Sequence, residues 1–299
     1  MRILLKLGLC IFLCSLYILT YAKSDRLEFD NPLRIPIYLA GNFGELRPNH
    51  FHTGLDIKTN QQENLPVYAA AEGYVSRINI SHTGYGNCVH IAHPNGYTTV
   101  YAHLNDFNPA ITAYINALQY EQKTWAIDVK VPPNTLPISR GEQIAWSGNT
   151  GGSVAPHLHF EVRNTVTEKV INPMIWGFKH EDRIAPTIKS IAFYDEQSPY
   201  IQDPITKSVI KNGVSHHLSE SVVKLPISRL RIGYDAVDFM NGSTNTLGIY
   251  QSKLYVNNEL QLIITMDTID FSTNKAINAF ADYKSDKLLN TWYVQFFKL

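Results

Sequence analysis

The sequence predicts a mainly β protein: an antiparallel β-sheet domain with one inserted helix, followed by a β-sandwich-like module. Three observations predict this fold class. Short runs of alternating apolar and polar residues, separated by turn signals, recur from about residue 31 to 179. A single stretch after Asn108 has helical periodicity instead. Beyond about residue 186 the strand-like runs return.

The first 22 residues are predicted to be a signal peptide. Arg2 and Lys6 give a positive start, an apolar run follows from Leu7 to Thr20, and Ala22 supplies a small residue at its end. The run of 14 residues is shorter than the roughly 20 that span a bilayer, which disfavours an anchoring helix. We therefore expect an exported protein, periplasmic or associated with the cell envelope, without a stable membrane span.

The cysteines bear on membrane anchoring and on stability. Cys10 and Cys14 lie in the apolar run but lack the small preceding residues of a lipidation site, so a lipoprotein is the weaker interpretation. Cleavage would leave Cys88 alone, which excludes an intramolecular disulfide and favours a core position for this thiol. A secreted chain without disulfides must gain its stability from burial or from a bound metal.

The predicted domain spans residues 23–183. Within it, residues 66–80 are β-rich and broken at Gly73, and Pro94-Asn95-Gly96 joins two strands, 87–92 and 96–103, as a hairpin. Asn108 can cap a helix that begins at Pro109. Its expected buried face consists of Ile111, Tyr114, Ile115 and Leu118. We expect the helix and the proline-rich chain after it to be an insertion.

A second, β-rich accessory module is predicted for residues 186–299. Two strand-like runs, Tyr250–Val256 and Leu260–Met266, are joined at Asn257-Asn258. The chain ends on another strand-like run, 292–297, with no tail, which is compatible with a module that is incomplete in this sequence. This module could bind glycan, bind a partner or guard a cleft.

The charge balance disfavours nucleic acid as a partner. Lys+Arg and Asp+Glu both number 26, and no basic run of five residues occurs. Since affinity for a polyanion depends on clustered basic side chains, we expect no nucleic-acid binding.

The histidines form the sharpest pattern. His157 to Arg163 alternates strictly between polar and apolar residues, so a strand would place His157 and His159 on one face together with Glu161. A second motif pairs His52 with Asp56 across Gly54, where a turn could fold the imidazole back toward the carboxylate. One imidazole and one carboxylate, plus an imidazole of the later strand, would leave an open position, as in catalytic zinc sites.

A third motif ends at His103. Tyr97, Thr99, Tyr101 and His103 would share one strand face, with His103 at the strand end and projecting into a cleft. Each motif alone has an ordinary structural interpretation, and the three in this order are more specific. Arg47 and Asn149 are either substrate contacts or ordinary loop residues.

The sequence resembles the lysostaphin-type zinc peptidases over about residues 35–175. The matching segments are Asn49–Asp56, Tyr101–Leu104, Ser147–Gly151 and Pro156–Glu161. Ala155 departs from the glycine that is usual in relatives. The resemblance implies a duplicated hybrid motif of antiparallel strands, with His52, Asp56 and His159 as zinc ligands. It further implies that His103 and His157 are catalytic histidines that do not bind the metal.

The implied function is that of a zinc-dependent endopeptidase that hydrolyses peptide cross-links of bacterial peptidoglycan during cell-wall remodelling. A Gram-negative-like envelope would make the D-alanyl–diaminopimelate bond the target. The peptidoglycan peptide is then the expected partner, and no protein partner is indicated. The alternative is a non-catalytic envelope regulator that activates an amidase. Relatives of that kind have lost metal ligands, whereas this sequence retains all of them.

Overall fold

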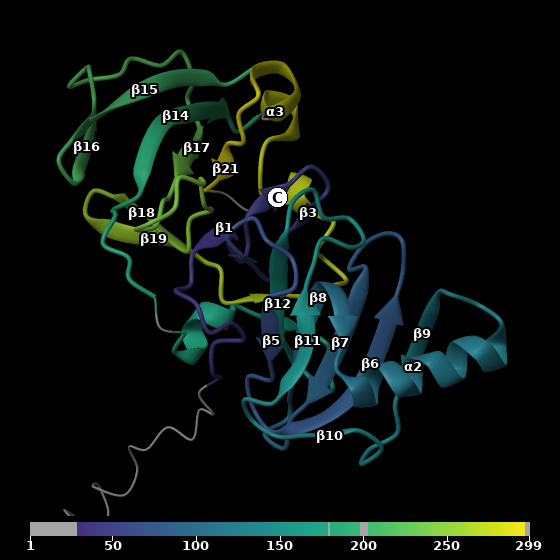
Figure 1. Ribbon diagram of the computed structural model, residues 1–299. Coiled ribbons are helices and arrows are strands. Elements are labelled where there is room, and N and C mark those ends of the chain that lie inside the picture. The colour runs from purple at the N-terminus through teal and green to yellow at the C-terminus, as the bar shows by residue number, and fades with distance from the viewer. Residues whose placement is uncertain (1–28, 179, 198–202, 297–299) are drawn as a thin grey trace, which may run out of the picture.

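The computed structural model describes residues 29–178, 180–197 and 203–296 (Figure 1). The predicted signal peptide, residues 1–22, lies outside them. The described chain forms a 12-stranded sheet, a 5-stranded sheet and two 2-stranded hairpins. Their strands pair antiparallel throughout the described residues. The predicted fold class, mainly β with antiparallel sheets, is confirmed.

The large sheet positions the candidate site. Its main path runs β1 (Leu39–Gly41), β4 (Leu55–Lys58), β12 (His157–Asn164), β8 (Tyr97–Phe107), β7 (Asn87–Ala92), β6 (Gly73–Ile80) and β10 (Pro137–Ile138). Beside this path lie β5 (Pro66–Tyr68), β9 (Ile127–Lys130), β11 (Gln143–Ser147), β13 (Val170–Ile171) and β20 (Thr268–Ile269). Strands β4 and β8 flank β12, and His159 stands opposite Asp56 on one side and Ala102 on the other.

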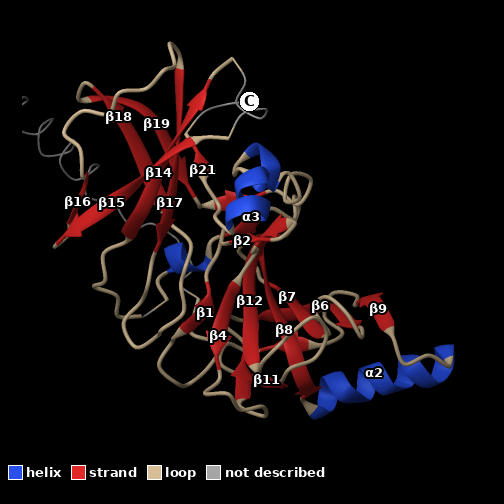
Figure 2. Cartoon of the chain, turned by 90° about the horizontal axis from the view of Figure 1, so that it is seen from above, coloured by secondary structure: helices blue, strands red, loops and turns tan. Residues whose placement is uncertain are grey.

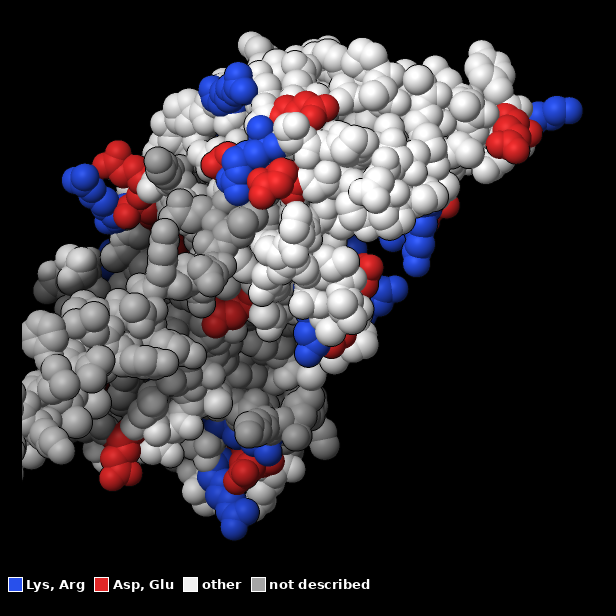
Figure 3. Space-filling model, turned by 90° about the horizontal axis from the view of Figure 1, so that it is seen from below, with Lys and Arg blue, Asp and Glu red and all other residues white. Residues whose placement is uncertain are grey.

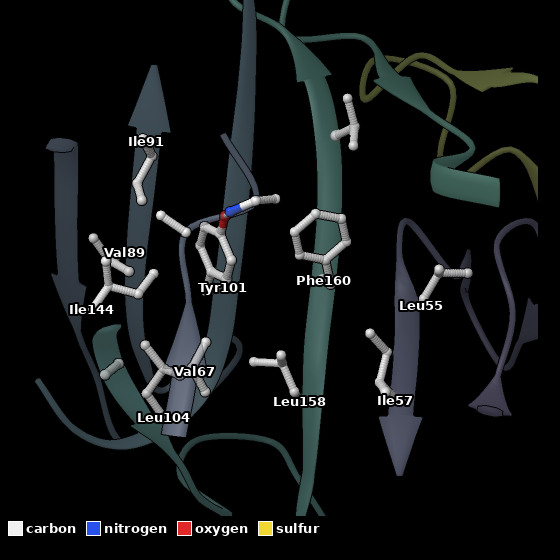
Figure 4. Close-up of a cluster of buried hydrophobic side chains, with 14 of the residues drawn as sticks. Leu55, Ile57, Val67, Val89, Ile91, Tyr101, Leu104, Ile144, Leu158 and Phe160 are labelled. Carbon is white, nitrogen blue, oxygen red and sulfur yellow. The ribbon is translucent and has the colours of Figure 1, made fainter. Parts of the chain in front are cut away.

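One face of this sheet is packed into the core. Leu158 and Phe160 of β12 are fully buried, next to Leu55 and Ile57 of β4 and Tyr101 of β8 (Figure 4). Burying each such side chain stabilises the fold by roughly 1.5–3 kcal/mol. Because a slip of one residue would exchange the two faces of β12, this burial fixes which face carries the histidines.

The predicted helix is α2 (Pro109–Gln122), which lies beside β6 and β9 in Figure 1. The Asn108 side chain accepts a hydrogen bond from the Ile111 amide at 2.9 Å, and Pro109 occupies the first turn. Ile111 and Ile115 are buried, and the helix ends at Lys123 in the left-handed conformation, with φ 50°. The predicted cap is therefore confirmed, and the predicted buried face is confirmed for Ile111 and Ile115, whereas Tyr114 and Leu118 are only partly buried.

The second sheet follows the order β16 (Ser215–Leu218), β15 (Ile205–Asn212), β14 (Thr187–Asp195), β17 (Leu230–Val237) and β21 (Val294–Gln295). The predicted hairpin is β18 (Gln251–Val256) and β19 (Glu259–Thr265), and its turn residues Asn257 and Asn258 both have positive φ. The remaining elements are β2 (Leu46–Arg47), β3 (His50–Phe51), η1 (Pro173–Trp176), η2 (Ile277–Ala279) and α3 (Tyr283–Leu289). No helix in the described residues is long and apolar enough to cross a membrane.

The C-terminal half also packs on the large sheet. Strand β20 pairs with β13, and Met240, Leu247 and Ile269 belong to the large hydrophobic core. The Asn42 side chain hydrogen-bonds Gly248 through both its oxygen and its nitrogen, each at 2.8 Å. Residues beyond 186 therefore build a sheet of their own. They also contribute to the core that packs against β12, the histidine strand, which carries His157 and His159. The domain boundary at 183–186 stays a prediction.

Candidate metal centre and its cleft

Three side chains converge on one point. The Nε2 atom of His52 lies 3.0 Å from Oδ1 of Asp56 and 3.2 Å from Nδ1 of His159, and the last two atoms are 2.9 Å apart. His52, Asp56 and His159 are all buried, and among the described residues they form a group that could hold a metal ion. A tetrahedral zinc ion with bonds of about 2.0–2.1 Å has ligand-to-ligand distances of about 3.3 Å. The observed separations therefore fit such an ion after small adjustments.

Gly54 permits this convergence. A Cβ atom at this position would lie 2.6 Å from the Phe160 carbonyl oxygen and 2.8 Å from the His159 ring. Only glycine lets the chain between His52 and Asp56 pass so close to β12. The sequence predicted a turn at Gly54. In the structure, glycine is needed at this position because the backbone passes so close to β12.

Hydrogen bonds orient both imidazoles toward the common point. Nδ1 of His52 donates to the Asn42 carbonyl oxygen at 2.8 Å, and Nε2 of His159 donates to Oε1 of Glu161 at 2.9 Å. These tautomers are assigned from the partners, because a carbonyl or carboxylate oxygen can only accept. The opposite ring nitrogens are left to bind a cation, which is the usual arrangement around metal-bound histidines.

The ligand carboxylate is held by a cation. Arg47 donates from Nη2 to Oδ2 of Asp56 at 2.9 Å and contacts Glu45 at 3.2 Å. Burial alone would raise the pKa of Asp56, but the charge of His52 and hydrogen bonds from nearby histidines hold it well below its usual value. Arg47 thus fixes one carboxylate oxygen and leaves the other for a metal. The sequence had offered it only as a substrate contact or a loop residue.

Below His159 lies a buried ionic network. Glu161 is fully buried and accepts hydrogen bonds from Thr53 at 2.6 Å, Tyr85 at 2.7 Å and Arg163 at 2.7 Å. Burial raises the pKa of Glu161, but Arg163 and His159 outweigh it and lower that pKa far below the usual range. Burial lowers the pKa of His159, but hydrogen bonds to Asp56 and Glu161 and the charges of these two carboxylates outweigh it and raise that pKa to about 9. A cation that binds here must therefore displace a proton from His159.

His103 reaches the same face through a β-bulge. Tyr101 pairs with Val89 and Leu104 with Asn87, so Ala102 and His103 together oppose a single residue of β7. His103 has φ 59°, in the left-handed region. The prediction that it shares the face of Tyr101 at a strand end is wrong: Tyr101 lies in the core and β8 continues to Phe107. The bulge turns the imidazole instead toward His157, with ring centroids 4.8 Å apart.

The glycine-rich loop between β11 and β12, which contains Gly148, Gly151 and Gly152, holds the two remaining histidines. Nδ1 of His103 donates to the Thr150 carbonyl oxygen at 2.8 Å, and Nδ1 of His157 donates to that of Ala155 at 2.8 Å. Burial lowers the pKa of His103 to about 4, and the charges of His159 and His157 act in the same direction. His103 is therefore neutral near pH 7, and its Nε2 has no hydrogen-bond partner among the described residues. Nε2 of His157 lies 3.3 Å from Oδ1 of Asp56.

These groups line an open cleft of about 730 Å³. All five predicted site residues border it: His52, Asp56, His103, His157 and His159. The C-terminal half supplies part of the wall through Asn245, Phe271 and Asn274. Phe271 lies over the Arg163 guanidinium, 4.6 Å from its carbon to the ring centroid. No local sequence signal could assign these residues, since they lie more than 80 positions from the histidine strand.

Three of the other histidines occupy structural positions away from the converging ligand atoms. His93 bonds the Glu72 carbonyl oxygen and the Thr99 hydroxyl, at 2.7 and 2.8 Å. His82 stacks on Trp125 with ring centroids 4.0 Å apart, and His90 is buried in β7.

On the face of the molecule shown in Figure 3, charged side chains of both signs are interspersed among neutral residues.

Comparisons with known proteins agree with the predicted resemblance. Residues 50–119 match the model of Peptidase family M23, a stretch that includes His52, Asp56 and His103 but not His157 or His159. The chain is 32% identical over 131 residues to an uncharacterized metalloprotease of Haemophilus influenzae, covering 44% of this chain and 21% of that protein. It is 33% identical over 123 residues to the DD-carboxypeptidase/endopeptidase Mpg of Neisseria meningitidis, covering 41% and 22%.

The similarity extends to lysostaphin of Staphylococcus simulans, with 30% identity over 111 residues, 37% of this chain and 17% of that protein. The solved catalytic domain of lysostaphin aligns with a TM-score of 0.33 and 26% identity, covering 46% of this chain and 88% of that domain. The matches thus span only about a fifth of the curated relatives' length. The resemblance to lysostaphin-type peptidases is confirmed, and the implied enzyme class, a metal-dependent peptide-bond hydrolase, is that of the matched proteins.

Proposed function

We propose that this chain is an exported, zinc-dependent endopeptidase that hydrolyses peptide cross-links of bacterial peptidoglycan. The observation that carries the proposal is the convergence of His52 Nε2, Asp56 Oδ1 and His159 Nδ1. Two nitrogens and one oxygen suit zinc, and three protein ligands beside an open cleft leave a position for water. The Neisseria relative is named a DD-carboxypeptidase/endopeptidase, which favours the D-alanyl–diaminopimelate bond as the target.

Zinc held by these side chains would lower the pKa of coordinated water to about 7 and polarise the scissile carbonyl. The remaining chemistry falls to residues of the chain. His103 is neutral, and its Nδ1 is committed to Thr150, so its Nε2 can accept a proton. His157 faces the same space with its Nε2 and, since its Nδ1 donates to Ala155, would donate to the negative charge that develops on the substrate oxygen in its doubly protonated form.

Digestion of purified cross-linked muropeptides tests this function. We expect cleavage by the protein as purified, loss of cleavage after chelation, and recovery on addition of zinc but not magnesium, which prefers oxygen ligands. Mass analysis of the products identifies the bond, and elemental analysis of the protein identifies the metal. Cleavage that survives complete metal removal, or protein that binds zinc but leaves every muropeptide intact, would contradict the proposal.

A further inference from the structure

A second cavity, of about 420 Å³, lies between the second sheet and the segment that leads into β2. One wall is the segment Gly44–Leu46, which enters β2, and the other comes from β14, β17 and the chain at Asn290–Trp292. Figure 2 shows β2 beside α3, on the side of the large sheet that faces the second sheet. Glu45 lines both this cavity and the cleft with the candidate metal ligands. The two spaces are therefore neighbours across one side chain.

The cavity contains a separated pair of opposite charges. Asp235 of β17 stands opposite Ser190, and the pairing of β14 with β17 shifts register between Ile188 and Ser190, which makes Lys189 the extra residue of a bulge. Lys189 and Asp235 both line the cavity. Within the described residues neither side chain forms an ion pair or hydrogen bond. Burial raises the pKa of Asp235, and the charge of Lys189 only partly opposes this, as expected for a half-buried carboxylate without a direct partner.

We propose that this cavity binds the zwitterionic end of a peptide, with an ammonium group on Asp235 and a carboxylate on Lys189. Tyr234 and Trp292 would flank the peptide's aliphatic part. The inference rests on the proposed function, because cross-linked stem peptides carry a diamino acid with both charges. A stem peptide extending from the cleft past Glu45 would bring its charged end into the cavity.

Titration calorimetry tests the site without relying on turnover. The protein is the full chain carrying His103→Ala, loaded with zinc, and the probe is the tripeptide L-alanyl-D-glutamyl-diaminopimelate. A blocked tripeptide, acetylated at its amines and amidated at its carboxylates, is the comparison ligand. We expect Asp235→Asn and Lys189→Gln each to weaken binding of the free tripeptide about tenfold, as for loss of one partly exposed charged contact. Neither should change binding of the blocked tripeptide.

Lys253→Gln is the matched control, since Lys253 is an exposed lysine of the same half of the chain and does not line the cavity. It should leave the affinity unchanged. Equal affinity in all variants, equal binding of both tripeptides, or binding of a peptide-free glycan instead would overturn the proposal. Lys189 is exposed, so its variant remains informative if Asp235→Asn does not fold. Charge-dependent binding without muropeptide cleavage by the unsubstituted chain would refute the proposed function and retain the site, whereas cleavage without such binding would do the reverse.

Discussion

Nε2 of His159 and Oε1 of Glu161 lie 2.9 Å apart although both residues belong to one strand, and this contact fixes which nitrogen of His159 can bind a metal. Glu161→Gln would replace the charged acceptor with a neutral amide. The positive charge of Arg163 would then lose its buried carboxylate partner. We expect zinc affinity to fall roughly 10–100-fold, as for other losses of a partner behind a metal-bound histidine. Competition with a chromophoric chelator measures the change.

Glu168→Gln is the control for this substitution. Glu168 also contacts Arg163, at 3.3 Å, but its side chain is 63% exposed and does not contact His159. Its loss should leave zinc affinity within a factor of about two, because exposed ion pairs contribute little. Similar zinc affinities for both variants would show that the bond to His159 is unimportant.

The ligand and non-ligand histidines should separate by metal content. His159→Ala removes one of three converging ligand atoms, so zinc and muropeptide cleavage should both be lost. His103→Ala should retain zinc and lower kcat by about 10²–10⁴-fold, the usual contribution of a general acid or base. Metal analysis and single-turnover kinetics check both. Full activity in His103→Ala would remove this residue from the mechanism.

Gly86 tests whether the glycine-rich loop orients His103. It has φ 63°, and a Cβ atom there would lie 2.5 Å from the Thr150 carbonyl carbon and 2.6 Å from the Gly151 nitrogen. Gly86→Ala should therefore displace the carbonyl group that His103 bonds, lowering kcat at least tenfold without loss of zinc. Gly96 also has positive φ, 83°, but open space around it. Gly96→Ala should cost about 1 kcal/mol of stability and leave kcat unchanged.

The sequence predicts this site wherever local periodicity controls geometry. Strict alternation from His157 to Arg163 correctly separates the polar face of β12 from its core face, because the side-chain period of a strand is two. The same rule fails at His103. A bulge with a non-glycine residue at positive φ reverses the alternation there, and no residue type in the segment signals it.

Contacts between segments that are far apart in the sequence also cannot be predicted from local sequence patterns. The bond from Arg47 to Asp56 depends on how β2 lies against β4, and the place of Phe271 in the cleft depends on β20 joining β13. In both cases the partner is selected by tertiary packing of the whole core, which periodicity within a short window cannot encode.

Phe271 should affect substrate binding more than the chemical step. It lines the cleft, is 38% exposed and lies over Arg163. Phe271→Ala should raise KM for a cross-linked muropeptide several-fold, because an apolar wall is removed from the cleft, with a smaller change in kcat. Tyr283→Ala removes an aromatic residue of similar exposure, 42%, from α3 outside the cleft, and should change neither constant. A fall in kcat alone for Phe271→Ala would point to misplaced catalytic groups instead.

His90 should make the protein sensitive to acid. It is 7% exposed in β7, and burial lowers its pKa to about 3; Arg163 and Arg77 add to this effect, while Glu161 and Asp128 oppose it. The folded state therefore keeps His90 neutral where the unfolded chain, with a pKa near 6.5, takes up a proton. The stability of the folded state that depends on neutral His90 is fully present above pH of about 6.5 and is lost progressively toward pH of about 3, roughly 5 kcal/mol in total.

Chemical unfolding of the metal-free protein between pH 7 and pH 4 measures this dependence. His90→Leu should flatten it by up to about 1.4 kcal/mol per pH unit relative to the unsubstituted chain, because one fewer proton is taken up on unfolding. His217 is exposed in β16, so His217→Gln should leave the slope unchanged. Since the carboxylates and the remaining histidines are common to all three proteins, the difference in slope isolates His90. Identical slopes for His90→Leu and the unsubstituted chain would mean that His90 is already protonated in the folded state at neutral pH, or that it titrates with an unshifted pKa.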